Sequence, residues 1–209
     1  RLVPLGRMAA HTDTVVSIPA DSVTLAGDLQ VPPGADGLVV FAHGSGSSRL
    51  SPRNTFVAER LRERGLGTLL FDLLTDREDR DRAARFDIDL LTGRLLAATQ
   101  WLRAREDTAD VALGYFGSST GAAAALRAAA RRDDIAAVVS RGGRVDLASE
   151  SLSDVTAATR FVVGGADTDV LSLNRTASEQ LTGAAATDLT VVEVAGHLFE
   201  GAGELETVA

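Results

Sequence analysis

Cysteine is absent from this chain of 209 residues, which excludes disulfides, thiolate metal sites and a cysteine nucleophile. Long hydrophobic runs are missing as well. The longest candidate, residues 121–130, is interrupted by Arg127 and is shorter than the roughly 18–20 apolar residues of a membrane span. Because no such run is present, we expect no membrane partner. A chain without cysteine suits a reducing compartment, so we expect a cytoplasmic protein.

Positive charge is also scarce, since the formal net charge is −8 and the isoelectric point is about 4.9. Such a chain repels phosphate backbones, and we expect no nucleic-acid partner. The length suits one sizeable core. Residues 1–7 precede Met8, which resembles a natural start, and they lack the apolar centre of a signal peptide. We therefore expect a leader or remnant at 1–7 and one domain over 8–209.

Alternating apolar strands and amphipathic helices predict an α/β fold, with a mostly parallel sheet covered on both faces. Helices are expected to begin at Ser51-Pro52 and at Asp87, and a third is expected over residues 171–181. The first two strands should pair antiparallel. Only about 20 residues separate the strands at 135–140 and 161–163, which is too few for a large lid domain and predicts an open pocket. The expected strands are residues 14–18, 23–31, 38–42, 68–71, 111–116, 135–140, 161–163 and 189–194.

The segment Gly117-Ser118-Ser119-Thr120-Gly121 lies between an apolar strand and an alanine-rich helical stretch. In that context a Gly-x-Ser-x-Gly sequence forms a nucleophile elbow, a turn so tight that the residues beside the serine must be small. The spacing makes Ser119 the central serine and the predicted nucleophile. Ser118 is the variable residue before it.

An acid and a histidine follow Ser119 in the order Ser, Asp, His, each just past a predicted strand. His197 is the histidine in the right position to accept the serine proton, and Asp167 would orient its imidazole. Asp169 is the rival acid, which we assign instead to a helix cap or turn. The sequence therefore predicts a catalytic triad of Ser119, Asp167 and His197.

The loop at residues 43–46, His-Gly-Ser-Gly, follows the strand at 38–42 and is suited to stabilising an oxyanion. We expect one donor to be the Thr120 backbone N–H, at a helix N-terminus, and the other to be the Ser45 N–H. His43 is expected to form structural hydrogen bonds rather than act as a base. His43 and Gly44 are expected to line the substrate site.

Four arginines fall in loops that should face the rim of this site: Arg49, Arg53, Arg141 and Arg144. They could recognise a carboxylate or phosphate on the substrate, or they could form internal salt bridges with the abundant acids. Both interpretations stay open. Arg141 and Arg144, which flank two glycines after a strand, are the pair that we favour for substrate binding.

His-Gly-x-Gly, Gly-x-Ser-x-Gly, Gly-x-Asp-x-x-Val and a late Gly-His together resemble the α/β-hydrolase superfamily over nearly the whole chain from about Ser22. Residues 42–49, 51–54 and 140–144 resemble the small, lidless dienelactone-hydrolase-like branch. The resemblance implies a single-domain α/β-hydrolase fold that needs no metal or organic cofactor. Dienelactone hydrolases proper use a cysteine nucleophile, so Ser119 favours a more general carboxylic-ester hydrolase.

We therefore predict a serine hydrolase that cleaves a carboxylic ester, lactone or thioester of a small acyl substrate through an acyl-enzyme. An acyltransferase or cyclase would use the same triad. A catalytically idle scaffold that binds a ligand or a protein is the alternative from another class, because fold alone does not fix function. The sequence leaves a homodimer open.

Overall fold

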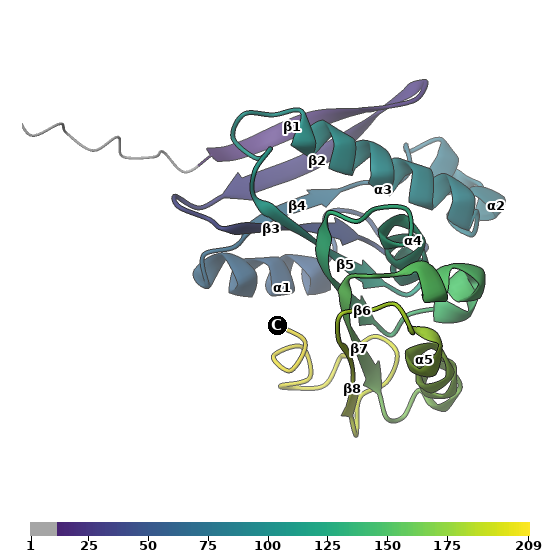
Figure 1. The fold of residues 1–209 in the computed structure, drawn as a ribbon. Helices are drawn as coiled ribbons and strands as arrows, with labels where there is room; N and C mark the ends of the chain where they lie inside the picture. The colour runs from purple at the N-terminus through teal and green to yellow at the C-terminus, as the bar shows by residue number, and fades with distance from the viewer. Residues whose placement is uncertain (1–11) are drawn as a thin grey trace, which may run out of the picture.

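An eight-stranded sheet forms the centre of the molecule in a computed structural model that describes residues 12–209 (Figure 1). The strand order is β1-β2-β4-β3-β5-β6-β7-β8. The strands are β1 Thr12–Ala20, β2 Val23–Val31, β3 Gly37–Ala42, β4 Gly67–Phe71, β5 Ala112–Ser118, β6 Ile135–Arg141, β7 Ala158–Gly164 and β8 Thr187–Val192. The helical segments are α1 Pro52–Glu63, η1 Glu78–Arg80, α2 Arg82–Arg85, α3 Ile88–Arg103, α4 Thr120–Ala129, η2 Val145–Asp154 and α5 Thr168–Gln180, of which η1 and η2 are 3₁₀ helices.

Strands β3 to β8 pair in parallel, and the two N-terminal strands form the antiparallel end of the sheet. The predicted α/β fold and the antiparallel first pair are confirmed. From β3 the chain continues to β4 on one side, and β5 lies on the other side. Ligands bind at such a reversal, beyond the carboxyl ends of the strands, and the loops after β3 and β5 meet there.

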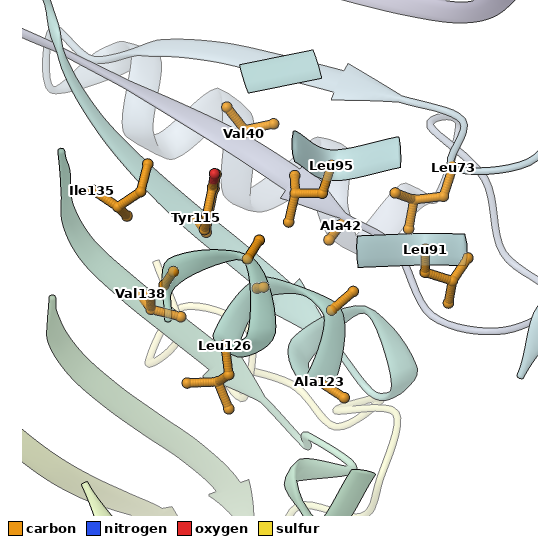
Figure 2. Close-up of a cluster of buried hydrophobic side chains, with 14 of the residues drawn as sticks. Val40, Ala42, Leu73, Leu91, Leu95, Tyr115, Ala123, Leu126, Ile135 and Val138 are labelled. Carbon is orange, nitrogen blue, oxygen red and sulfur yellow. The ribbon is translucent and has the colours of Figure 1, made fainter. Parts of the chain in front are cut away.

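The central strands are buried on both faces because successive side chains point to opposite sides of a sheet. On β3, Val40 belongs to one apolar cluster and Phe41 to another. On β5, Tyr115 and Phe116 divide in the same way. Figure 2 shows the first cluster, in which residues of β3, α3, β5, α4 and β6 meet. This alternation explains why the strands appear in the sequence as continuous apolar runs.

Helices α3, α4 and α5 cover one face of the sheet, and α1 covers the other together with the C-terminal segment (Figure 1). Helix α4 packs closely because its alanines, Ala122 to Ala125 and Ala128 to Ala129, are fully buried. Between β6 and β7 the chain forms only η2 and no lid domain. None of the helices described for residues 12–209 has the length and apolar composition needed to cross a bilayer.

The predicted helix starts are confirmed by their side-chain caps. Ser51 Oγ accepts a hydrogen bond from the Asn54 N–H at 3.4 Å, and Pro52 takes the first helical position of α1. Asp87 accepts a hydrogen bond from the Leu90 N–H at 3.0 Å and caps α3. The first of these caps fixes where α1 begins, and therefore which of its residues face the carboxyl edge of the sheet. The expected leader at residues 1–7 lies outside the described residues.

Candidate active site

Ser119 lies at the turn between β5 and α4 in a backbone conformation that non-glycine residues rarely adopt. Its φ is 52° and its ψ is −120°, a strain that costs about 1–3 kcal/mol. The glycines on either side are required by close packing. A Cβ on Gly117 would lie 2.4 Å from Ala122 Cα, and one on Gly121 would lie 2.1 Å from the Ala42 carbonyl oxygen. The segment therefore has the geometry of a nucleophile elbow.

Hydrogen bonds from a neighbouring loop hold the elbow in this conformation. The Ser119 N–H donates to the Arg141 carbonyl at 3.2 Å, and the Arg144 N–H donates to the Ser119 carbonyl at 3.0 Å. On the other side the loop after β3 passes close by, since a Cβ on Gly44 would lie 3.2 Å from Ser119 Cβ. Ser119 is thus held between the loops that follow β3 and β6.

His197 and Asp167 are brought together from the loops after β8 and β7. The imidazole Nδ1 lies 2.7 Å from Asp167 Oδ2, and the carboxylate is the more buried of the two groups. Asp167 occupies the N-cap position of α5, but its side chain bonds His197 rather than the helix. Asp169 is exposed in the first turn of the helix. The structure thus joins the favoured acid to the predicted base.

The imidazole is also held by backbone. Gly142 has a φ of 53°, and a Cβ at this position would lie 3.5 Å from both Nδ1 and Cε1 of His197. Within residues 12–209, the hydrogen bond to Asp167 is the only one made by the imidazole, and Ser119 Oγ makes none. With Nδ1 on the carboxylate, Nε2 is the nitrogen left to face a substrate or a nucleophile.

The two expected oxyanion donors lie side by side, but they are not equivalent. No residue between 12 and 209 accepts a hydrogen bond from the Thr120 N–H, which is the first of α4. The Ser45 N–H donates to Thr120 Oγ1 at 2.9 Å. Ser45 could therefore act as a donor only by sharing this hydrogen bond or by releasing it.

His43 has a structural position. Its Nε2 accepts a hydrogen bond from the Leu73 N–H at 3.0 Å, and its Nδ1 lies 3.0 Å from the Gly44 carbonyl. The ring is buried, which lowers its pKa below 6.5 and keeps the imidazole neutral. His43 therefore ties the end of β3 to the segment after β4 and does not line the cavity at Ser119.

Ser119 and His197 open into one cavity of about 160 Å³ at the carboxyl edge of the sheet. Serine, asparagine, arginine and histidine side chains supply most of the residues of its wall, and Leu198 is the one large apolar side chain among them. No carboxylate lines it. The lining residues are Gly44, Ser45, Ser47, Ser51, Arg53, Asn54, Ser118, Ser119, Arg141, His197 and Leu198.

Comparison with known proteins identifies the family. The solved structure of a dienelactone hydrolase from Anabaena variabilis is 50% identical in sequence, with a TM-score of 0.91, and the match covers 95% of this chain and 93% of that one. The chain belongs to the dienelactone hydrolase family. An α/β serine hydrolase homologue from Coxiella burnetii, 18% identical with a TM-score of 0.77 and 93% of each chain covered, shares the fold.

Two curated relatives, from two strains of Mycobacterium tuberculosis, are 55% identical to this family member over 198 residues. They carry the provisional name phosphoribosyl transferase. The match covers 94% of the chain but only 44% of each relative, so the chain spans less than half of their length. No protein-family model matches it.

In this member of the dienelactone hydrolase family, the arginines that line the cavity are not the pair expected from the sequence. Arg144 does not line the cavity, because its guanidinium bonds both carboxylate oxygens of Asp146, at 2.9 and 2.8 Å. Arg49 is paired with Asp28 and Asp72. The cavity instead joins Arg141 to Arg53, so Arg53 replaces Arg144 in the expected pair.

Several residues of the cavity wall escaped the sequence analysis. Asn54, in the first turn of α1, accepts a hydrogen bond from Ser118 Oγ at 3.3 Å, and Ser118 Oγ in turn accepts one from Arg141 at 2.9 Å. The signal available for Asn54 was the cap at Ser51, which places Asn54 in the first helical turn beside Arg53. Across residues 12–209 there is no cluster of three or more His, Asp or Glu side chains that could hold a metal ion.

Proposed function

We propose that the chain is a serine hydrolase that cleaves a carboxylic ester, lactone or thioester through an acyl-enzyme on Ser119. One observation carries the proposal. Ser119 is held in a strained elbow that opens into the same cavity as His197, and His197 Nδ1 is bonded to Asp167 at 2.7 Å. Membership of a hydrolase family supports it.

In the proposed reaction, Ser119 Oγ attacks the acyl carbon while His197 Nε2 accepts the hydroxyl proton. Collapse of the tetrahedral intermediate breaks the bond to the leaving group, which takes that proton from His197. A water molecule, deprotonated in turn by His197, then attacks the acyl-enzyme and releases the acid. Asp167 keeps the imidazole oriented and stabilises its cationic form.

Backbone donors would stabilise the oxyanion of the intermediate. The Thr120 N–H has no competing acceptor among residues 12–209 and lies at the N-terminus of α4, where the helix dipole favours negative charge. Ser45 would supply the second donor by transferring its N–H from Thr120 Oγ1 to the oxyanion.

Hydrolysis of short, uncharged esters by the wild-type chain and by Ser119→Ala tests the proposal. We expect turnover by the wild type and a loss of kcat/KM by several orders of magnitude in the variant. Turnover that survives in Ser119→Ala would contradict the assignment. Product analysis with an added alcohol or amine separates hydrolysis from acyl transfer, which would use the same three residues.

The transferase name of the mycobacterial relatives does not change this proposal. We assign that activity to the part of those proteins that the chain does not cover, because the matched 44% corresponds to the hydrolase-fold chain described here. We thus propose that the complete relatives contain two regions, a hydrolase-like region that matches this chain and a second region that accounts for their name.

A further inference from the structure

The cavity beside Ser119 contains a buried arginine whose charge is not paired. Arg141 is 6% exposed, and its Nε and Nη1 atoms have no hydrogen-bond partner within residues 12–209. Its Nη2 donates to Ser118 Oγ at 2.9 Å, and its guanidinium lies 5.6 Å from the centre of the Phe199 ring. Neither neighbour carries a negative charge.

A second cation faces the same space. Arg53 is half-buried in the first turn of α1, its Nε is buried without a partner, and no acid in the described chain forms a salt bridge with it. Burial, together with the charge of Arg53, lowers the pKa of Arg141 to about 10. Arg141 therefore remains protonated at neutral pH, and two like charges share one wall.

Holding two cations together in a partly dehydrated cavity is unfavourable unless an anion accompanies them. The other two arginines of the rim, Arg49 and Arg144, avoid this cost because nearby aspartates form salt bridges with them. Arg53 and Arg141 form no ion pair within residues 12–209, and the wall of the cavity beside Ser119 contains no carboxylate. Arg53 also lines an adjoining cavity with Glu200 and Glu206, but neither forms a salt bridge with it. An anion from outside the chain is the missing partner.

We propose that Arg53 and Arg141 bind a phosphate group carried by the substrate, next to the acyl carbon that Ser119 attacks. The proposal rests on the proposed hydrolase function and specifies its substrate class as a phosphorylated ester, lactone or thioester. The phosphate is held and not transferred. The bond that breaks is the acyl bond, and the phosphate leaves on whichever product carries it.

The composition of the cavity favours phosphate over a single carboxylate. Two guanidinium groups match the nearly two negative charges of a phosphomonoester at neutral pH, whereas a carboxylate would leave one cation uncompensated. Additional donors are available from Ser47, Ser51 and Asn54. The N-terminus of α1 adds its dipole on the same side. Three phosphate oxygens offer more acceptor sites for these donors than two carboxylate oxygens do.

Calorimetric titration with inorganic phosphate tests the subsite separately from catalysis. The protein is the full chain carrying Ser119→Ala, and the competing probe is acetate at the same ionic strength. We expect saturable phosphate binding and much weaker acetate binding. Adding Arg53→Gln should weaken phosphate binding by about ten- to a hundredfold. Adding Arg144→Gln instead is the matched control, and should leave the phosphate affinity unchanged.

Arg141→Lys provides a second test at the buried position. It keeps one positive charge but removes the guanidinium fork, so we expect phosphate affinity to fall at least about tenfold in a protein that remains folded by circular dichroism. Equal affinity for phosphate in all these variants would overturn the proposal. Tighter binding of acetate than of phosphate would also overturn it.

Failure of this inference can be distinguished from failure of the proposed function. If the wild type hydrolyses uncharged esters but Ser119→Ala does not bind phosphate, the hydrolase stands and the phosphate subsite is wrong. If phosphate binds through Arg53 and Arg141 while no ester is cleaved, the subsite stands and the hydrolase assignment is wrong.

Discussion

Ser119 combines a positive φ, a position at a helix N-terminus and access to a cavity. Strain of this kind persists only where the surroundings impose it. Here they do so through backbone hydrogen bonds to Arg141 and Arg144. The conformation lifts the hydroxyl away from the sheet, and this is the property that makes the residue a candidate nucleophile.

The two aspartates after β7 provide a matched pair for testing the triad. In Asp167→Asn the amide can donate to His197 Nδ1, which stabilises the wrong imidazole tautomer, and kcat should fall by about ten-thousandfold. Asp169→Asn, two residues away and exposed, should leave kcat within about twofold of the wild type. Steady-state kinetics on one ester compares them, and similar losses in both variants would reject Asp167 as the orienting acid.

Arg141 should contribute to binding at a cost to stability. Because its pKa is lowered to about 10, its charged form is less favourable in the folded than in the unfolded chain. The folded protein therefore loses this proton first, and the destabilisation is present below pH 10 and decreases above it.

Replacing Arg141 with Met, which can pack on Phe199, should raise the free energy of unfolding by about 1–3 kcal/mol at pH 7. Denaturation in phosphate-free buffer measures this change. The same variant should no longer bind phosphate. A less stable Arg141→Met protein would mean that the guanidinium is structurally compensated.

At the scale of elements, the unit formed by β5, the elbow and α4 depends on the approach of two backbones. Gly121 lies on α4 where a Cβ would come within 2.1 Å of the Ala42 carbonyl oxygen and 2.5 Å of the His43 carbonyl oxygen. The end of β3 and the start of α4 can therefore meet only at a glycine. This contact brings the loop after β3 close to Ser119.

Two glycine substitutions in helices should consequently have opposite effects. Gly121→Ala should lower the free energy of unfolding by about 3 kcal/mol or more, because backbone must move to accept the methyl group. Gly93→Ala, in α3 with nothing within 4 Å of the new Cβ, should raise it by about 0.5–1 kcal/mol. Urea denaturation measures both, and a neutral Gly121→Ala would refute the described packing.

His43 links the ends of β3 and β4, and it should make stability depend on pH. Burial lowers its pKa below 6.5 despite the opposing influence of the hydrogen bond to the Gly44 backbone and of the charges of Asp72 and Asp79. Below pH 6.5 this histidine binds a proton in the unfolded chain but stays neutral in the folded one. Its contribution to the free energy of unfolding is therefore fully present above pH 6.5 and is lost as the pH falls.

The slope from this one group is at most about 1.4 kcal/mol per pH unit. His43→Gln keeps an acceptor for the Leu73 N–H but does not titrate, so its melting temperature should vary less between pH 5 and 7 than that of the wild type. An identical pH profile for the two proteins would exclude His43 as the source.

Sequence periodicity predicted the strands, and local residue types predicted the caps at Ser51 and Asp87. The candidates Ser119, Asp167 and His197 could be chosen because each follows a predicted strand. The pairing of charges was not predictable in this way. Arg144 meets Asp146 only because the start of η2 turns the two side chains together. Arg53 and Arg141, which are far apart in the sequence, line the same cavity because α1 packs against the sheet beside the end of β6.

At the scale of the whole molecule, an acidic protein contains a positively charged cavity. The chain has a net charge of −8, yet the cavity beside Ser119 presents two unpaired arginines and no acid. The acids are concentrated elsewhere, many of them in ion pairs with surface arginines. A general acidic surface with one cationic cavity would direct a small anion to a single place.

Phosphate should accordingly stabilise the whole protein. A ligand that binds only the folded state adds about 2.7 kcal/mol at a concentration 100 times its Kd. For a domain of this size this raises Tm by roughly 5–10 °C. Thermal scans at constant ionic strength should show the shift in wild type and Arg144→Gln, and a reduced shift in Arg53→Gln. Equal shifts in all three would indicate a general salt effect.

Covalent labelling by a fluorophosphonate, followed by intact-mass measurement, tests the central claim that Ser119 is an activated nucleophile. The chain carries other serines, so the comparison includes Ser119→Ala and the exposed control Ser149→Ala in η2. We predict a single adduct on the wild type and on Ser149→Ala, and none on Ser119→Ala. A folded wild type that takes no adduct, or an adduct that persists in Ser119→Ala, would contradict the account.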